Sequence, residues 1–239
     1  MKNICILILI LNSLNISCIK KCNSFKNNND VLYGIDVSHY QEKLSKINWK
    51  LVAQNKNPKI SFAYIRTTMG KDGKDKAFEY NFKEAKKYGI KVGVYHYYRP
   101  NENSIEQVNN FFQHNIEIGD LPPVLDIEEK SKFGSRNLRK GILNFLKLTE
   151  KKYGIKPIIY AHQRFYNTHL RTKFSEYDIW IARQNGFTTF PDNNQMKKDP
   201  ILLDKKCPKI WQYSGTGTIN GIEGDVDLNV IHDSIWNQR

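Results

Sequence analysis

Short apolar segments that alternate with helical patterns constrain the fold of this chain more than any other feature of its sequence. Eight such segments are only a few residues long and apolar almost throughout, which is typical of parallel strands that are covered on both faces. The candidate strands are residues 33–37, 62–66, 91–97, 123–127, 157–160, 178–182, 210–213 and 226–230.

Helical periodicity fills three of the gaps between the early candidate strands. Apolar residues recur there at the spacing of a helix with one buried face. The second of these helices opens with the capping-box pattern SIEQ, so Ser104 is its predicted N-cap. The periodic residues are Phe78, Phe82 and Ala85 in the first helix, Ile105, Val108 and Phe112 in the second, and Leu138, Ile142, Phe145 and Leu146 in the third.

The hexapeptide KKYGIK occurs twice, at residues 86–91 and 151–156, each time between a helix and an apolar strand. Basic residues in a last helical turn, followed by a left-handed glycine, mark a helix-to-strand junction. The repetition indicates successive βα units and hence a (β/α)8-type barrel, which normally needs about 250 residues. Residues 33–239 fall short of that length, and residues 184–209 carry no helical period. The sequence therefore predicts an α/β fold, a modified (β/α)8-type barrel with reduced or missing late helices.

The N-terminal segment reads as an export signal over residues 1–18. A basic start precedes an apolar run at residues 4–14 that is too short to span a bilayer comfortably. Ser17 and Cys18 resemble the cleavage site of bacterial lipoproteins, in which Cys18 would be lipidated; an ordinary secretory signal cut nearby is the alternative. The polar residues 19–32 predict a flexible tether. We thus expect an exported protein of the cell envelope, either attached to the membrane through a lipid or secreted, with its folded body at residues 33–239.

The four cysteines do not form a recognisable framework. Cys5 lies in the signal and Cys18 at its end, which leaves Cys22 and Cys207. No spacing suggests a zinc site, and we expect neither metal nor cofactor. An exported pair can oxidise, but Cys22 falls in the tether, so the sequence gives a bridge between these two little support.

The charge balance favours an anionic partner. The chain has 37 Lys and Arg against 24 Asp and Glu, a formal net charge of +13. Such an excess suits nucleic acid, anionic membranes or anionic polymers. No nucleic-acid-binding motif is present, and an exported chain rarely meets nucleic acid, so we do not expect that partner.

Acidic residues follow the apolar strands. Asp36 ends the first candidate strand, Asp126 and Glu128 end the fourth, and Asp227 lies in the last. The C-terminal strand ends of a barrel form one rim, where active sites lie. Asp126 and Glu128 are two residues apart, so in an extended chain they project to the same side, about 6–7 Å apart. This arrangement suits two carboxyl groups that flank a glycosidic bond, one of them kept protonated by its charged neighbour.

Two other interpretations of these acids are open. A single acid at a strand end is usually a solvated charge or a helix cap, but convergence of several on one rim argues against that. A metal cage is the sharper alternative, although no pair has a recognised ligand spacing. Its ligands would be Asp36, His39, His96, Asp126 and Glu128.

Aromatic and polar side chains near the same strand ends are candidates for binding a sugar, whose apolar C–H faces stack on aromatic rings. Filling of the barrel interior is the alternative role for most of them. Trp211 is the favoured stacking platform. The candidate substrate-binding residues are Tyr64, Arg66, His96, Tyr97, Tyr160, Trp211 and Tyr213.

Several of these segments together resemble the glycoside hydrolase family 25 lysozymes, the N-acetylmuramidases. The segments occur in the family's order between residues 33 and 231. They are residues 33–41 (YGIDVSHYQ), 93–97 (GVYHY), 121–128 (LPPVLDIE), 211–214 (WQYS) and 221–229 (GIEGDVDLN).

The resemblance implies a flattened barrel and hydrolysis, with retention, of the β-1,4 bond between N-acetylmuramic acid and N-acetylglucosamine in peptidoglycan. It makes Glu128 the proton donor and Asp126 either the nucleophile or the carboxylate that orients the substrate's acetamido group. Asp36 and Asp227 complete the acidic rim.

The second strand departs from the family pattern. The family usually has FxxIKATEG there, whereas residues 62–70 read FAYIRTTMG. Arg66 keeps a cation with different hydrogen-bonding geometry, and Met69 removes a carboxylate. These changes bear on substrate preference more than on activity.

The leading hypothesis is thus an exported, monomeric muramidase that acts on peptidoglycan glycan strands. The alternatives are a non-catalytic glycan-binding barrel and a metal-dependent hydrolase of the same fold.

Overall fold

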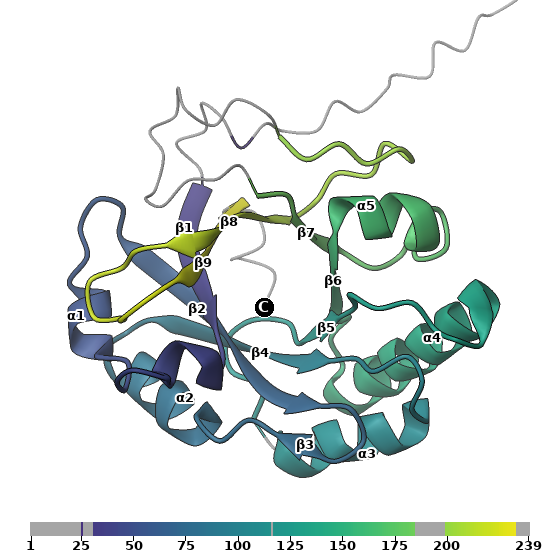
Figure 1. Ribbon diagram of the computed structural model, residues 1–239, viewed down its shortest axis with the longest axis horizontal. Coiled ribbons are helices and arrows are strands. Elements are labelled where there is room, and N and C mark those ends of the chain that lie inside the picture. Colours follow the sequence, from purple (N-terminus) through teal and green to yellow (C-terminus); the bar gives the residue numbers. More distant parts are fainter. Residues whose placement is uncertain (1–24, 26–30, 116, 185–198, 233–239) are drawn as a thin grey trace, which may run out of the picture.

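Eight strands close into a barrel in the computed structural model, which describes residues 25, 31–115, 117–184 and 199–232 (Figure 1). The strands follow the order β1-β9-β8-β7-β6-β5-β4-β2, and pairing between β1 and β2 closes the ring. All eight predicted strands are present. They are β1 (Val31–Val37), β2 (Ile60–Met69), β4 (Lys91–Tyr97), β5 (Val124–Asp126), β6 (Ile158–His162), β7 (Ile179–Ala182), β8 (Ile210–Gly217) and β9 (Val226–His232).

The last strand runs against the others, which corrects the prediction of an all-parallel sheet. β9 is antiparallel to both β8 and β1, while all other neighbours in the ring are parallel. The loop of residues 218–225 is enough for this turn, because antiparallel neighbours need no helical crossover. Asp227 therefore lies near the start of β9, where it pairs with Asp36 at the end of β1.

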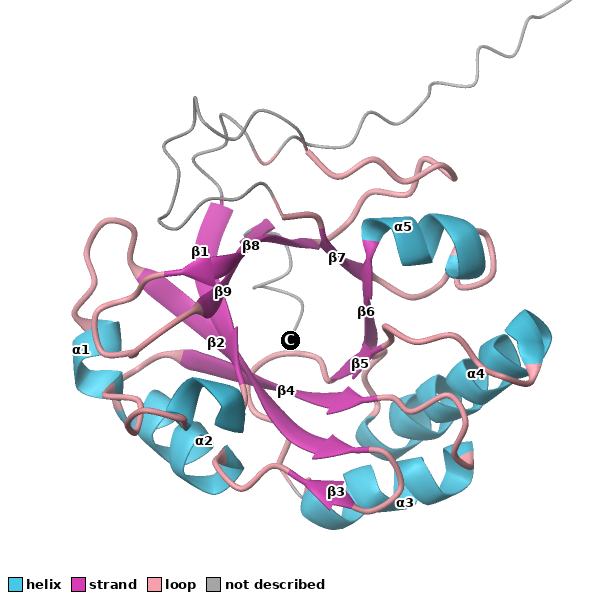
Figure 2. Cartoon of the chain, viewed as in Figure 1, coloured by secondary structure: helices cyan, strands magenta, loops and turns pink. Residues whose placement is uncertain are grey.

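Helices cover one side of the barrel more completely than the other (Figure 2). The three periodic segments form α2 (Phe78–Lys87), α3 (Ser104–His114) and α4 (Gly134–Tyr153), as predicted. Between β7 and β8 the described residues contain no helix, and β8 joins β9 through a loop. The expected reduction of the late helices is thus confirmed in the part of the chain that the structure covers. The remaining helical elements are η1 (His39–Glu42), α1 (Trp49–Ala53) and α5 (Gln163–Phe165), which continues into a π-helical turn (Tyr166–Leu170).

Two local details differ from the sequence analysis. Asn103, not Ser104, caps α3, since its Oδ1 accepts hydrogen bonds from the backbone N–H groups of Ile105 and Glu106. Ile105 is accordingly 54% exposed and does not share the buried face with Val108. A short strand, β3 (Gly73–Lys74), pairs with the end of β2 and was not predicted, because two residues carry no periodicity.

Side chains of the strands alternate between the inside of the barrel and its outer shell. The inner cluster contains Phe62 and Tyr64 of β2 and Trp180 of β7, whereas Ile65 and Ile181 belong to the outer cluster, which packs against the helices. This alternation decides which residues near the rim face the centre of the barrel.

The folded body begins before the predicted boundary at residue 33. Val31 and Leu32 pair with β9 as part of β1. Phe25 is 2% exposed and stacks on His232 at 4.2 Å, so it is not part of a free tether. Cys207 forms a disulfide. The other three cysteines, the predicted signal and the lipidation site Cys18 lie outside the described residues. Within the described part, no helix is long and apolar enough to cross a membrane.

Candidate active site

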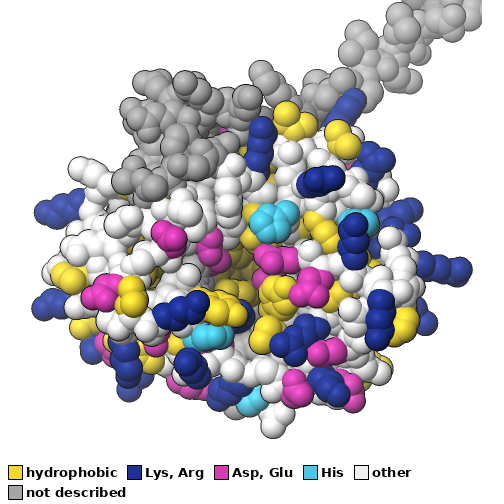
Figure 3. All heavy atoms as spheres, viewed as in Figure 1, with side chains coloured by type: hydrophobic (Ala, Val, Ile, Leu, Met, Phe, Trp, Pro, Cys, Tyr) yellow, Lys and Arg dark blue, Asp and Glu magenta, His cyan; other side chains and the backbone are white. Residues whose placement is uncertain are grey.

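A cleft opens at the rim where β1, β2, β4, β5 and β6 end and β9 begins. Figure 3 shows acidic side chains gathered around a central hollow, with most Lys and Arg side chains toward the periphery. The cleft is lined by Asp36, Ser38, Tyr40, Gln41, Arg66, Tyr95, Tyr97, Val124, Asp126, Glu128, Tyr160, Trp180, Gln212 and Asp227.

The structure brings the four predicted acids together. Asp36 and Asp227 lie side by side on β1 and β9, Asp126 ends β5, and Glu128 follows two residues later. Because β9 is antiparallel, its second residue reaches the same rim as the ends of the parallel strands. Three of the acids thus lie at or just after strand ends, as predicted, whereas Asp227 lies near the start of its strand.

Asp36 is the acid with the best-defined partners. Its Oδ2 accepts hydrogen bonds from Gln212 Nε2 at 2.9 Å and from Asn229 Nδ2 at 2.7 Å. Burial raises the pKa of Asp36 to about 6, while these two amide donors pull it down and the charge of Glu128 pushes it up. Two donors on one oxygen favour the ionised carboxylate, so Asp36 is the acid best supported as an anion.

Asp126 lies in a less favourable place for a charge. It is buried, and its Oδ1 accepts no hydrogen bond from the described residues. Burial raises the pKa of Asp126 well above its usual range, and the charges of Glu128 and Asp36 add to this, whereas Arg66 opposes it. A buried carboxyl oxygen without a hydrogen-bond partner is costly for the fold. Asp126 lines the cleft, so its carboxyl group lies where a ligand binds.

Glu128 stands at the edge of the cleft, with a side chain that is 32% exposed. Burial raises its pKa, the nearby His162 and a hydrogen bond involving Tyr160 lower it, and Glu129 raises it. His162 Nε2 lies 3.7 Å from Glu128 Oε1. A carboxyl group with a raised pKa and contact with solvent can deliver a proton to a bound ligand.

Asp227 completes the group of acids. Its pKa is raised to about 9, first by burial and then by the charges of Asp36 and Glu128. At neutral pH the cleft therefore holds both protonated and ionised carboxyl groups, which is the condition for acid and base roles within one site.

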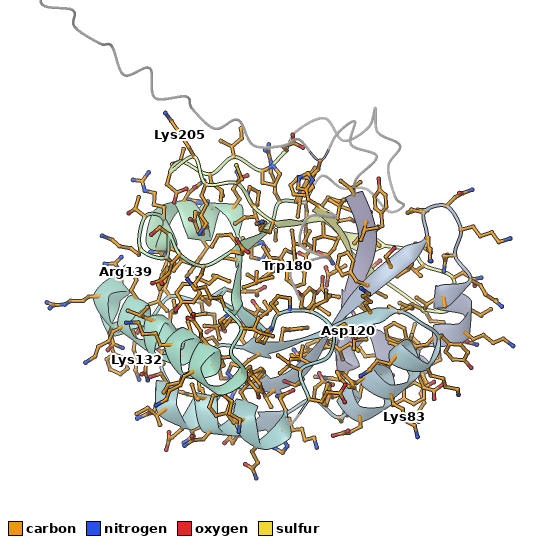
Figure 4. The ribbon with its side chains drawn as sticks, turned by 180° about the vertical axis from the view of Figure 1, so that it is seen from behind. Lys83, Asp120, Lys132, Arg139, Trp180 and Lys205 are labelled. Atoms are coloured by element: carbon orange, nitrogen blue, oxygen red, sulfur yellow. The ribbon has the colours of Figure 1, made fainter. Side chains whose placement is uncertain are left out.

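Polar side chains below the acids form a continuous hydrogen-bonded chain. Trp180 Nε1 donates to Asn229 Oδ1 at 2.9 Å, and Asn229 in turn donates to Asp36. On the other side, Tyr160 Oη donates to Gln212 Oε1 at 3.0 Å, and Gln212 donates to Asp36. Figure 4 shows Trp180 near the centre of the barrel, whereas the labelled Lys83, Arg139 and Lys205 point outward.

Three predicted binding residues other than the acids do line the cleft, namely Arg66, Tyr97 and Tyr160. Tyr97 Oη donates to Glu129 Oε1 at 2.8 Å. Arg66 donates from Nε to Asp75 Oδ2 at 2.9 Å. Arg66 is also the only Lys or Arg in the cleft lining of the described structure.

Four predicted binding residues do not line the cleft, and their positions correct the prediction. His96 points to the outer shell, where it stacks on Phe145 and bonds to Thr68, and burial lowers its pKa to about 3. Trp211 and Tyr213 also face outward and are buried in the outer cluster. Tyr64 does face inward, but it lies below the cleft, two residues further from the rim than Arg66.

The sequence analysis missed the residues that replace them. Trp180 is the tryptophan of the cleft, and Gln212 and Asn229 hold Asp36. One signal was available, since a polar residue inside an apolar strand must find a partner when it is buried. Gln212 lies between two aromatic residues of β8, and Asn229 lies between Leu228 and Val230 of β9.

The proposed metal cage is not assembled. His96 faces away from the cleft, and His39 Nδ1 is 3.0 Å from Asp75 and 2.7 Å from Arg66. Among the described residues, no group of three or more His, Cys, Asp or Glu side chains is placed to hold a metal ion. The arrangement is instead that of several carboxyl groups with different proton affinities around one cleft.

Comparisons with known proteins agree with this geometry. The model of Glycosyl hydrolases family 25 matches residues 35–222, more than half of the chain. Uncharacterized protein YegX of Escherichia coli strain K12 is 36% identical over 207 residues, which are 85% of this chain and 71% of YegX. Lysozyme M1 of Streptomyces globisporus is 30% identical over 223 residues, 84% of this chain and 68% of that protein.

Solved structures give the same result. A family 25 glycosyl hydrolase from Bacillus anthracis superposes with a TM-score of 0.71 at 28% identity, covering 84% of this chain and 88% of its own. A bacterial lysozyme from Streptomyces coelicolor superposes with a TM-score of 0.66 at 29% identity, covering 84% and 92%. The barrel with an antiparallel last strand, the acids at its rim and these matches lead to one conclusion: the chain belongs to glycosyl hydrolase family 25.

Proposed function

We propose that the protein is a peptidoglycan hydrolase that cleaves the β-1,4 bond between N-acetylmuramic acid and N-acetylglucosamine. The observation that carries the proposal is the pairing of a partly exposed Glu128 with a buried, unpartnered Asp126 on one rim. The match to Glycosyl hydrolases family 25 and the similarity to Lysozyme M1 support the same substrate.

Glu128 is the proposed general acid. Burial raises its pKa, which outweighs the lowering by His162 and favours the protonated form that can donate to the leaving glycosidic oxygen. His162 stands 3.7 Å away and, when charged, stabilises the carboxylate that the proton transfer leaves behind. The same carboxylate then serves as the base for the attacking water.

Asp126 is the proposed partner at the anomeric carbon. Two roles fit its carboxyl group in the cleft lining: attack on the carbon to form a glycosyl-enzyme, or acceptance of a hydrogen bond from the substrate's acetamido N–H while the acetamido oxygen attacks. Both lead to retention. In either case the ionised Asp36 supplies negative charge near the oxocarbenium-like transition state.

A non-catalytic glycan-binding barrel is the competing function. Against it stands the cost of four carboxyl groups close together in one cleft, two of them buried (Asp36 and Asp126) and two half-buried (Asp227 and Glu128). Burial raises the pKa of each of the four. A binding module gains nothing from acids that resist ionisation, whereas an acid–base catalyst requires them.

Glu128→Gln tests the proposal when it is compared with the wild type in release of reducing ends from purified peptidoglycan. We expect a loss of at least about a hundredfold in rate, with unchanged thermal stability. Asp126→Asn should lose most activity as well. Glu117→Gln is the matched control, because this exposed glutamate pairs with Lys86 away from the cleft. Wild-type turnover by Glu128→Gln, or by Asp126→Asn, would contradict the proposed roles.

Export and lipid attachment through Cys18 form a second part of the proposal and rest on the sequence alone. Labelling with radioactive palmitate in a bacterial host should mark the wild type and Cys22→Ala but not Cys18→Ala. A wild-type chain that takes up no label would contradict lipid attachment at Cys18 and would favour an ordinary secretory signal.

The positive charge of the chain suggests how it finds its substrate. Lys and Arg side chains lie around an acidic cleft (Figure 3). Attraction to an anionic envelope polymer is expected to weaken as salt rises from about 0.05 to 0.5 M, because the screening length shortens. Binding to intact cell walls that does not change over this range would contradict an electrostatic contribution.

A further inference from the structure

Arg66, Asp75 and His39 form a hydrogen-bonded group on one wall of the cleft, called here the Arg66 triad. Arg66 Nε donates to Asp75 Oδ2 at 2.9 Å, and Arg66 Nη2 lies 2.7 Å from His39 Nδ1. The Asp75 side chain is 1% exposed and also accepts from the backbone N–H groups of His39 and Ala77. Burial alone would raise the pKa of Asp75, but these bonds and the charge of Arg66 bring it below its usual value. Asp75 is therefore a fixed anion.

His39 Nδ1 lies within hydrogen-bond distance of both a donor, the Arg66 guanidinium, and an acceptor, the Asp75 carboxylate. It lies 2.7 Å from Arg66 Nη2 and 3.0 Å from Asp75 Oδ2. A guanidinium group has only donors, and a carboxylate has only acceptors. An unprotonated Nδ1 accepts from Arg66, while a protonated Nδ1 donates to Asp75 and places its own N–H against the guanidinium. The two arrangements exclude each other.

Arg66 has one nitrogen left for a ligand. Its Nη1 makes no hydrogen bond with the described residues, and Arg66 lines the same cleft as the acids. The ring of Tyr40, which is 53% exposed, lies 5.1 Å from Arg66 Cζ. The wall therefore presents a fixed planar donor beside an exposed aromatic ring, a combination that suits a sugar with an oxygen acceptor on its edge.

We propose that Arg66 positions the bound saccharide by donating from Nη1 to one of its oxygen atoms, and that Asp75 and His39 hold Arg66 in place only while His39 is neutral. The inference rests on the proposed function in so far as the ligand is a saccharide. Asp75 and His39 are positioning residues, because they act through Arg66.

The groups around His39 define the pH dependence. Asp75 faces it from the segment after β3, and Arg66 faces it from β2. The ring of Tyr40, the next residue in η1, is tilted against the His39 ring, with 4.4 Å between the ring centroids. Lys43 reaches only the ring of Tyr40. When His39 becomes an imidazolium, it turns its proton to Asp75, Arg66 loses a bond, and glycan binding weakens.

Nitrogen-15 NMR of the full-length chain tests the triad without any activity. We expect neutral His39 to carry its proton on Nε2 and leave Nδ1 bare, because Nδ1 accepts from Arg66. In Arg66→Gln the proton should move to Nδ1, facing Asp75. His39→Gln assigns the signal, and His162→Gln is the matched control on the other side of the cleft. A wild-type proton on Nδ1 would overturn the triad.

Binding of a muramyl–glucosaminyl oligosaccharide to the Glu128→Gln variant tests the role of Arg66. The dissociation constant should rise about tenfold from pH 8 to pH 5, consistent with loss of a hydrogen bond to a charged group. Adding His39→Gln should remove this rise, because glutamine accepts from Arg66 but does not titrate. Adding Arg66→Gln should weaken binding at both pH values.

Two results would overturn the positioning role. They are an unchanged pH dependence in the His39→Gln background and unweakened binding in the Arg66→Gln background. If the Glu128→Gln variant bound no glycan at any pH, the proposed function would fail and take the substrate part of the inference with it. The NMR result would still decide the triad.

Discussion

The side-chain amide of Asn229 donates a hydrogen bond of 2.7 Å to Oδ2 of Asp36, which joins the antiparallel last strand to the first strand at the base of the cleft. Together with Gln212, this donor holds the pKa of Asp36 at about 6, against burial and the charge of Glu128, which raise it. The negative charge of Asp36 is therefore stabilised by the amide of Asn229, which lies on β9, the strand that runs antiparallel to its neighbours.

Replacing Asn229 by Ala should move the acid limb of the pH–activity profile to higher pH. Asp36 is an anion only above its pKa, and loss of a donor raises that pKa further. The shift should be about one pH unit in kcat/KM, since one hydrogen bond to a charged group contributes roughly that much. Asn144→Ala is the control, because the Asn144 amide donates to Ser104 outside the cleft. An unmoved acid limb in Asn229→Ala would contradict the role assigned to this amide.

Asp227→Asn should stabilise the protein at neutral pH. The pKa of Asp227 is raised to about 9 in the folded state and is near 3.8 when unfolded, so the folded state holds a proton that the unfolded state releases. Stability from this group is fully present below about pH 4 and declines as pH rises toward 9. Asparagine removes that decline, so the gain should be near zero at pH 4 and at least about 1 kcal/mol, roughly 2–4 °C in Tm, at pH 7.

Asp204→Asn is the control, because it should change Tm at pH 7 in the opposite direction. Burial alone would raise the pKa of Asp204, but hydrogen bonds from Thr172, Tyr166 and Lys206 lower it. It therefore stabilises the fold above its unfolded pKa and loses this contribution as pH falls. Asp204→Asn should lower Tm at pH 7 and have less effect near pH 3. A Tm of Asp227→Asn that falls at pH 7 would contradict the raised pKa.

The two tryptophans should respond differently to replacement by Phe. Trp180→Phe removes the donor to Asn229 and alters the cleft lining, so KM should rise severalfold. Trp211→Phe removes a hydrogen bond to the backbone of Arg183 outside the barrel interior, so it should cost about 1 kcal/mol of stability and leave KM unchanged. Steady-state kinetics well below Tm, together with thermal melts, separate the two. A raised KM with unchanged Tm in Trp211→Phe would restore Trp211 as the stacking platform.

The strands could be predicted from the sequence because each is an apolar run bounded by helical periods or turns. The direction of β9 could not, since an apolar run reads the same in both directions. The only local hint was the short connection of residues 218–225 after β8, too short for a helical crossover. Asp227 was placed at the correct rim, although by an argument that assumed a parallel strand.

The acids could be found because a carboxylate that follows a buried strand is unusual. The aromatic partners were chosen without fixing which face of each strand points inward, and a shift of one residue exchanges the two faces. Asp36 and Asp126 could have fixed this alternation within their own strands. In β8 the residue that faces the cleft is the polar Gln212, so its two neighbours, Trp211 and Tyr213, belong to the outer cluster instead.

The Arg66 triad lay beyond the reach of sequence patterns. Asp75 follows the two-residue strand β3 and meets Arg66 only because β3 folds back on β2. A two-residue strand such as β3 has no hydrophobic periodicity, so the contacts made by this hairpin could not be predicted from the sequence.

The chemical identity of the reducing ends tests the central claim most directly. Purified peptidoglycan is digested with the full-length protein, the fragments are reduced with borohydride, and mass spectrometry identifies the reduced sugar. We expect reduced N-acetylmuramic acid, absent from digests with Glu128→Gln. Reduced N-acetylglucosamine, or fragments with new amino-acid ends and no new sugar ends, would contradict the account.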